Sequence, residues 1–137
     1  MTETRLFFLL AQAHRAVARE ANKLSERATG APAVQIAALF ALNGGSAQLN
    51  ELGKALRLNR TATSDLVRRM EVAGLVTKRR SPTDGRAQII KTTAKGRRAH
   101  DRALPVIAAF NQRIRGQLSD DELEVVVRFL SRLMTEL

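Results

Sequence analysis

The sequence predicts a mostly α-helical fold that carries one small β-hairpin. Three observations lead to this fold class. Apolar residues recur at intervals of three and four over most of the 137 residues, as they do on the buried face of a helix. Between residues 75 and 92 the interval shortens toward two, which is typical of strands. Glycine, proline and asparagine separate these stretches, where the chain is expected to turn.

Length and composition restrict the class of protein. A chain of 137 residues suits one domain with a core and is too short for two of typical size. It has no cysteine, which excludes disulfides, zinc ribbons and thiol redox sensing. The two histidines, His14 and His100, stand far apart, and no acidic cluster of ligand spacing surrounds either. We therefore expect no metal, no cofactor and no catalytic site, and hence no enzyme.

A short apolar run near the start, residues 6–10, resembles part of a secretory signal. A signal needs roughly 7 to 15 apolar residues and a membrane span roughly 20, so the run is too short for either. Helical spacing also continues past it through Val17 and Leu24. We expect an amphipathic helix in a cytoplasmic protein that does not enter a membrane.

Two helices are expected before the centre of the chain. The first covers residues 5–27 and has an apolar face made of Leu6, Leu9, Leu10, Ala13, Val17, Ala21 and Leu24. Gly30 ends this helix, and Pro32 suits the first turn of the second. The second ends at residues 43–46, Asn-Gly-Gly-Ser.

Two shorter helices should follow, joined by a tight turn. The first runs from Leu49 to about Leu56, and the second from Arg60 to about Ala73. Asn59 precedes the second helix and is a good N-cap, whereas Gly74 follows it and accepts the left-handed conformation that ends helices. The positions of the second helix that should face the core are Thr63, Leu66, Val67 and Met70.

The hairpin is expected over residues 75–80 and 87–92, joined by a loop with the turn formers Pro82 and Asp84-Gly85. A long helical stretch then runs from residue 93 to about 118, and Pro105 should kink or break it. Ser119 and Glu122 form a capping-box pattern that starts the last helix.

The last helix has an unusually large apolar face for the end of a small monomer. Val125 and Phe129 widen a stripe made of Leu123, Val126, Val127, Leu130, Leu133, Met134 and Leu137. This stripe and the first helix could close a monomeric core, or they could pair across a two-fold axis. We favour the dimer, with Leu6, Leu9 and Leu10 joining the seven stripe residues at its interface.

The formal net charge of +10 is confined to one part of the chain. Between Lys54 and Arg102 there are 14 Lys or Arg and four Asp or Glu, while the two signs balance elsewhere. Such a distribution is typical of a module that binds a polyanion. A membrane surface would instead select a basic amphipathic helix, whereas these cations span helices, hairpin and loops.

Two short helices, a tight turn and a basic hairpin make a winged helix-turn-helix. One helix fits the major groove of double-stranded DNA, and the hairpin reaches along the backbone to the narrower groove. We assign residues 31–101 to this DNA-binding region, and residues 1–30 and 102–137 to dimerisation helices. The DNA-binding candidates are Arg60, Thr61, Ser64, Asp65, Arg68 and Arg69 on the second helix, and Lys78, Arg79, Arg80, Asp84 and Arg86 on the hairpin.

The stretch of residues 47–98 resembles the MarR family of bacterial transcription regulators. The matching motifs are Gly74-Leu75-Val76, Asp84-Gly85-Arg86-Ala87 at the wing tip, and Thr93-Ala94-Lys95-Gly96 before the next helix. Among the departures, Arg57 replaces a usual Gly in the turn and Ser81 a usual Asp. The resemblance implies that Arg86 enters the minor groove while Asp84 holds either the loop or the arginine.

The predicted function is a homodimeric transcription regulator, a repressor, on a pseudo-palindromic DNA site. The resemblance also implies a small aromatic or phenolic ligand between the dimerisation helices and the DNA-binding lobe, although a chain with five Phe and neither Trp nor Tyr furnishes few aromatic side chains for it. Two alternatives remain open. One is an architectural DNA-binding protein without a specific operator, and the other is a winged helix that binds RNA or protein.

Overall fold

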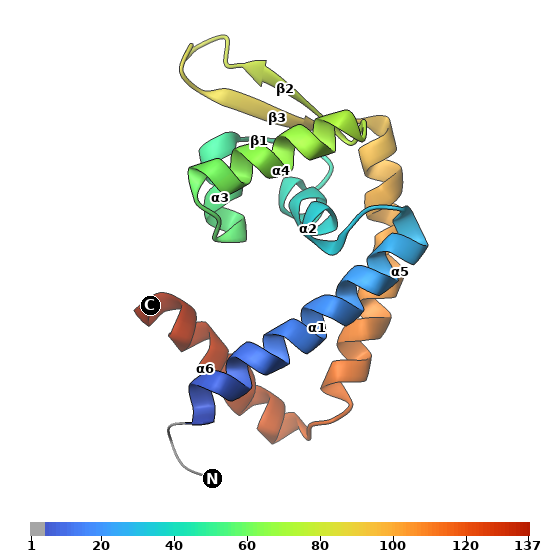
Figure 1. Cartoon of the computed structure of the whole chain (residues 1–137), viewed down its shortest axis with the longest axis vertical. Coiled ribbons are helices and arrows are strands. Elements are labelled where there is room, and N and C mark those ends of the chain that lie inside the picture. Colours follow the sequence, from blue (N-terminus) through green and yellow to red (C-terminus); the bar gives the residue numbers. More distant parts are fainter. Residues whose placement is uncertain (1–4) are drawn as a thin grey trace. The chain divides into compact units, whose positions relative to one another are not determined.

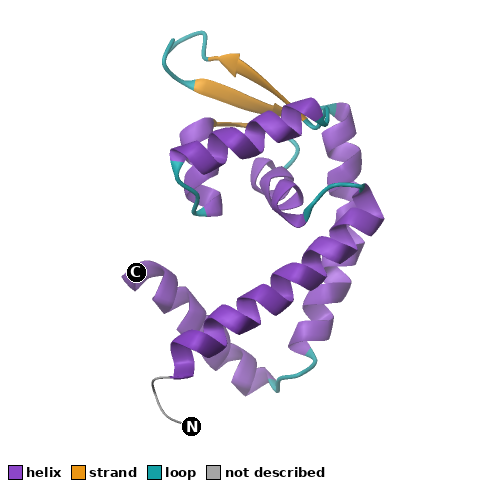
Figure 2. Ribbon diagram, in the orientation of Figure 1, coloured by secondary structure: helices purple, strands orange, loops and turns teal. Residues whose placement is uncertain are grey.

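The computed structural model describes residues 5–137 and contains six helices and three strands within them (Figures 1 and 2). The chain forms two compact units: the first ends at Val106, and the second begins at Ile107. The elements in order are α1 (Arg5–Thr29), α2 (Ala33–Leu42), β1 (Ser46–Gln48), α3 (Leu49–Leu56), α4 (Arg60–Val72), β2 (Val76–Arg80), β3 (Gln88–Thr92), α5 (Ala94–Arg115) and α6 (Asp120–Glu136). The predicted fold class is confirmed, and α5 continues from the first unit into the second.

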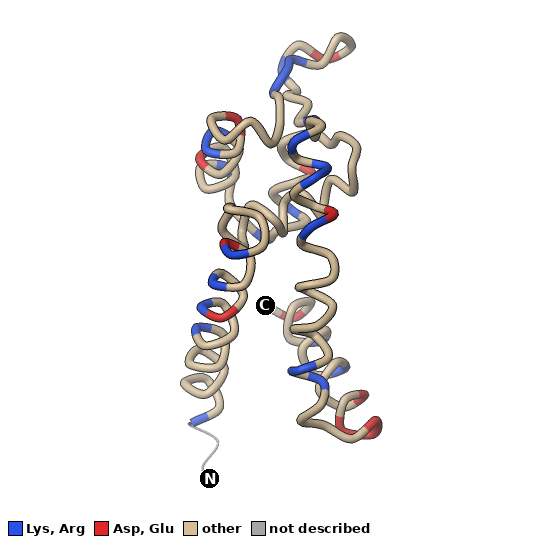
Figure 3. The backbone as a smooth tube through the Cα atoms, turned by 90° about the vertical axis from the view of Figure 1, so that its right-hand side faces the viewer, with Lys and Arg blue, Asp and Glu red and all other residues tan. Residues whose placement is uncertain are grey.

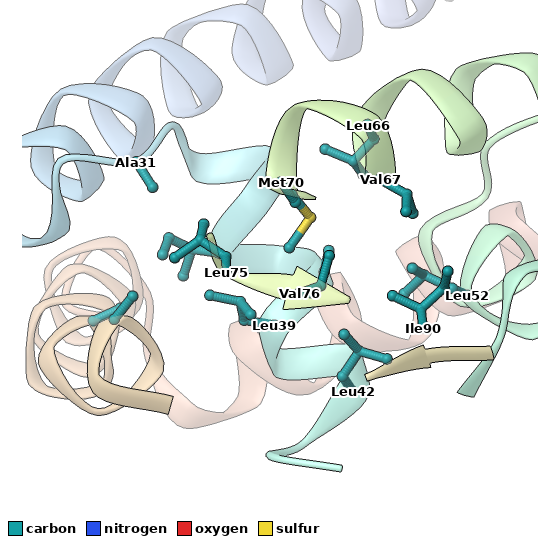
Figure 4. Packing of buried hydrophobic residues seen from close by; sticks show 14 of the residues in the cluster. Ala31, Leu39, Leu42, Leu52, Leu66, Val67, Met70, Leu75, Val76 and Ile90 are labelled. Atoms are coloured by element: carbon teal, nitrogen blue, oxygen red, sulfur yellow. The ribbon is translucent and has the colours of Figure 1, made fainter. Parts of the chain in front are cut away.

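The hydrophobic core of the first unit lies between α2, α3, α4 and the sheet (Figure 4). Its most deeply buried side chains are 1% exposed or less and include Ile36, Leu39, Leu52, Val67, Met70 and Ile90. The four inward positions predicted for α4 are all buried. This core therefore fixes which face of α4 remains for a partner.

The sheet has three antiparallel strands in the order β1-β3-β2, one more than the sequence predicts. The extra strand, β1, is three residues long and pairs with β3 so that Gln48 lies opposite Ile89. Three residues are too few to reveal an alternating pattern, and their partner strand lies about 40 residues further along the chain. The strand connects the base of the hairpin directly to the start of α3.

The turn between α3 and α4 contains the Arg57 departure. Arg57 has φ 56° and ψ 40°, the left-handed conformation in which a glycine is more common. The N–H of Leu58 then donates to the carbonyl of Gly53 at 2.9 Å, closing the end of α3. As predicted, Asn59 caps α4, because its Oδ1 accepts the Ala62 N–H at 2.8 Å.

The Thr-x-x-Gly motif joins the end of α4 to the start of α5. The Thr93 hydroxyl donates to the Gly74 carbonyl at 2.6 Å and accepts the Gly96 N–H at 3.0 Å. The Lys95 ammonium donates to the Ala73 carbonyl at 2.7 Å. One threonine thus caps α5 and also secures the glycine that ends α4.

Pro105 does not break the long helix, so of the two predicted outcomes, a kink or a break, the break does not occur. Helix α5 runs through it as one element of 22 residues. A proline removes one backbone hydrogen bond at a cost of about 3 kcal/mol, and the bonds of the remaining turns can offset that local loss. The boundary between the two compact units falls directly after it, at Val106.

The second unit contains the end of α5 and the whole of α6. The predicted capping box is present: the Ser119 hydroxyl accepts the Glu122 N–H at 3.2 Å, and the Ser119 N–H donates to Glu122 Oε1 at 2.9 Å. These hydrogen bonds lower the pKa of the Glu122 carboxyl below its ordinary value. No residue of helix α6 is buried, so the residues of its apolar stripe remain half-buried or exposed.

Candidate nucleic-acid interface

The face of α4 that the core leaves free carries the predicted DNA-binding residues. Helical spacing places them opposite the buried side chains of Leu66 and Met70. Arg60, Thr61, Arg68 and Arg69 are exposed, while Ser64 and Asp65 are half-buried. Apart from Arg69, which lies at the edge, they form one polar surface along the helix.

Asp65 lies beside Arg68 on this surface. Its Oδ1 is 3.0 Å from the Arg68 guanidinium, and their side chains are 47% and 66% exposed. At that exposure the ion pair adds little to stability. Its effect is to hold the arginine over the middle of the face.

The register of the hairpin divides its three consecutive cations. Lys78 lies opposite Ile90, and Arg80 lies opposite Gln88. The side chains of Lys78 and Arg80 therefore lie on the same face of the sheet, the face that packs against the core at the other end of the hairpin. Arg79 lies opposite Ile89 on the other face. The Lys78 ammonium is 4.0 Å from the Glu71 carboxylate at the end of α4. The three cations therefore present charge on both faces of the wing. Figure 3 marks the Lys and Arg positions along the wing in blue.

The tip of the wing is shaped by short polar contacts. Asp84 Oδ1 accepts the Arg86 N–H at 3.0 Å, and the Asp84 carbonyl accepts the Ala87 N–H at 3.0 Å. The Ser81 hydroxyl, where the family usually has Asp, accepts the N–H groups of Thr83 and Asp84. Asp84 therefore holds the loop backbone, and within residues 5–137 no carboxylate pairs with the Arg86 guanidinium.

Some exposed residues near this surface were not predicted from the sequence. Val72, four positions after Arg68, is 87% exposed on the same side of α4, where an apolar side chain suits contact with a thymine methyl group. The sequence signal that could have identified Val72 is its spacing of four residues from Arg68. Gln48 and Asn50 were also missed, because their proximity to the wing depends on β1, and so was Gln88, a half-buried residue of the wing itself.

The predicted dimerisation residues lie in both compact units and remain partly or fully exposed. In α1, Leu6 is exposed and Leu9 and Leu10 are half-buried. In and after α6, the half-buried residues are Leu123, Val126 and Leu133, and the exposed ones are Val127, Leu130, Met134 and Leu137. Their role in dimerisation stays a prediction.

The remaining chemistry of the described residues is sparse. Nowhere in residues 5–137 do three His, Asp or Glu side chains gather closely enough to hold a metal ion. His100 packs edge-on against Phe40, with ring centroids 4.9 Å apart, and its Nδ1 is 3.0 Å from Asp101. Every helix in the same range is too short or too polar to cross a membrane.

Known proteins resemble this chain in sequence and in fold. Residues 29–87 match the family model described as MarR family. The PcaV transcriptional regulator of Streptomyces coelicolor, solved with its natural ligand, is 28% identical, with a TM-score of 0.81 over 98% of this chain and 93% of that one. A probable transcriptional regulator of Pseudomonas aeruginosa is 26% identical, with a TM-score of 0.81 over 94% and 96%.

A third protein resembles the chain in fold. Sco3205, a MarR family regulator of Streptomyces coelicolor solved in complex with DNA, has a TM-score of 0.89 over 99% of this chain and 92% of its own, at 21% identity. No protein of curated function matches the chain. The predicted resemblance to MarR regulators is confirmed.

Proposed function

We propose that this chain, whose residues 29–87 match the MarR family model, is a repressor of transcription. It acts as a homodimer on a pseudo-palindromic DNA site in the cytoplasm. The observation that carries this proposal is the coexistence, in one compact unit, of an exposed Arg60 and Arg68 face on α4 and an unpaired Arg86 at the wing tip.

We assign the contacts by groove. Helix α4 enters the major groove, where Arg68 and Ser64 reach base edges and Val72 meets a thymine methyl. Arg60, Thr61 and Arg69 contact base edges or phosphates there, and Lys78, Arg79 and Arg80 contact phosphates along the wing. Arg86 enters the minor groove, whose negative potential attracts a guanidinium.

The proposed dimer uses residues 1–30 and 102–137. The exposed apolar stripe of α6 and the apolar start of α1 supply self-complementary surfaces, as a two-fold interface requires. Two α4 helices then read half-sites about 34 to 36 Å apart, one turn of DNA. Occupying both blocks transcription from an overlapping promoter.

We also propose release of the DNA by a small aromatic or phenolic ligand. Support comes from PcaV, a structural neighbour solved with its natural ligand. Such a ligand acts by favouring a spacing of the two α4 helices that does not match the half-sites.

A footprint on the DNA around its own gene tests the proposed function. The dimer model predicts a protected two-fold site of about 20 base pairs, or two half-sites one turn apart. Protection without fixed boundaries would contradict the repressor model and would indicate the architectural alternative. Binding to RNA with no preference for duplex DNA would contradict both.

The substitution Arg86→Ala should weaken operator binding by about 1 to 3 kcal/mol, because it removes a guanidinium from a narrow minor groove. The loss should grow with the A·T content of the base pairs beside the wing. Titration of a set of operators with different flanks measures this dependence. Arg19→Ala, which removes an exposed arginine from α1, is the matched control. Equal losses on every flank, or no loss, would remove Arg86 from the minor groove.

A further inference from the structure

A small pocket lies between the wing and the helix-turn-helix. Its walls include Gln48 and Asn50 around the start of α3, Arg60 at the start of α4, and Arg86, Ala87 and Gln88 of the wing. We propose that this pocket, the phosphate seat, holds a single DNA backbone phosphate, with Asn50 and Gln88 as contacts beside Arg60. The inference rests on the proposed function and adds two contact residues to it.

The size of the seat suits part of one phosphate group. Its volume is about 20 Å³, enough for one water-sized group, so a single phosphoryl oxygen can enter while the rest of the phosphate stays at the mouth. The pocket is too small for a nucleobase or an aromatic effector. Its occupant therefore arrives attached to something larger that lies outside the pocket.

The charge of the seat selects an anion. Two arginines from different elements line it, and the carboxamides of Asn50 and Gln88 can each donate N–H groups to an oxygen. The two carboxylates closest in sequence accept backbone N–H groups: Glu51 accepts the Gln48 N–H at 3.1 Å, and Asp84 accepts the Arg86 N–H at 3.0 Å. No acidic side chain is among the residues that line the pocket.

The sheet register holds the two sides of the seat together. Strand β1 places Gln48 opposite Ile89 and runs directly into α3, so the start of α3 is hydrogen-bonded to the base of the wing. Gln88 shares the face of β3 that carries the buried Ile90, which directs it toward the helices. The spacing of the two walls is therefore set by the fold before DNA binds.

The position of the seat identifies the anion as DNA. In the proposed complex α4 lies in the major groove and Arg86 in the adjacent minor groove, and one sugar-phosphate backbone must pass between them. The seat lies between α4 and the wing tip, on the path of that backbone. A phosphate held there sets the distance between the base contacts of α4 and the minor-groove contact of Arg86.

Methylphosphonate scanning tests the seat. The probe is a duplex selected by the parent protein from a randomised pool, in which one phosphate at a time is replaced by an uncharged methylphosphonate. We expect the parent to lose roughly tenfold in affinity at one position per half-site, between the two groove contacts, because charge-assisted hydrogen bonds disappear there. Asn50→Ala and Gln88→Ala should each lose several-fold on unmodified duplex.

The decisive measurement is the coupling between protein and DNA changes. Asn50→Ala together with Gln88→Ala should lose less affinity than the parent does at that modification, because only the arginine contacts to the phosphate remain, whereas Gln12→Ala, an exposed amide on α1, should respond like the parent. Equal further losses for the double variant and the parent would overturn the seat and leave the regulator function standing. Failure of the parent protein to select any duplex would overturn both the phosphate seat and the proposed regulator function.

Discussion

The substitution Gly96→Ala is expected to destabilise the protein by more than about 3 kcal/mol, because its methyl group has no room. A Cβ built on Gly96 lies 2.2 Å from the Leu75 carbonyl oxygen and 2.8 Å from Thr92 Cγ2. The first of these atoms belongs to the backbone, so a rotamer change cannot relieve the contact. Chemical denaturation followed by circular dichroism measures the loss as a lower midpoint.

Gly85→Ala is the matched control for this prediction. A Cβ at Gly85 meets nothing within 4 Å. Its free energy of unfolding should stay within about 0.5 kcal/mol of the parent's. A Gly96→Ala protein as stable as the control would show that α5 can move away from the Leu75 carbonyl at little cost, contrary to the expected close approach.

The Gly96 contact also gives the Thr-x-x-Gly motif a physical reason. The Thr93 side chain joins the end of α4 to the start of α5, and this brings α5 close to the strand that begins the wing. Only a residue without a side chain fits where the two backbones meet. The spacing between Thr93 and Gly96 is thus one turn of a capped helix.

Local signals in the sequence predicted the elements that local chemistry determines. Asn59 and Ser119 cap the helices that they were expected to start, and α3 begins and ends at the predicted residues. Strand β1 was missed because its formation depends on a partner strand about 40 residues away. Pro105 does not break α5, because a residue preference does not report how strongly the neighbouring turns hold a helix.

In the candidate site, too, the sequence predicted the features that local pattern determines and missed those that depend on distant contacts. Helical spacing found the exposed face of α4 from four inward-facing residues, and alternation located the wing. The strand register was needed to show that Lys78 and Arg80 lie on one face of the wing and Arg79 on the other. Side-chain geometry was needed to show that Asp65 pairs with Arg68. The phosphate seat combines α3, α4 and β3, so no single stretch of sequence contains it.

Deleting residues 119–137 should lower operator affinity by two or more orders of magnitude while the helix-turn-helix and wing stay intact. Burying a fully exposed large apolar side chain is worth roughly 1.5 to 3 kcal/mol, and every residue of the α6 stripe is still half-buried or exposed within one chain. Without the stripe the dimer should dissociate. A monomer holds one half-site, and the second half-site then binds independently, without the high effective concentration that linkage provides.

Sedimentation of the truncated chain together with operator titration measures both effects. A second variant, Leu130→Asp, guards against aggregation of the truncated protein, because it places one charge in the stripe of the full chain. Arg128→Ala removes an exposed polar residue of the same helix and should leave the dimer unchanged. A truncated protein that remains a soluble dimer with full operator affinity would place the interface elsewhere. A monomeric parent would contradict the two-fold operator model itself, because isologous half-site recognition requires two copies of α4.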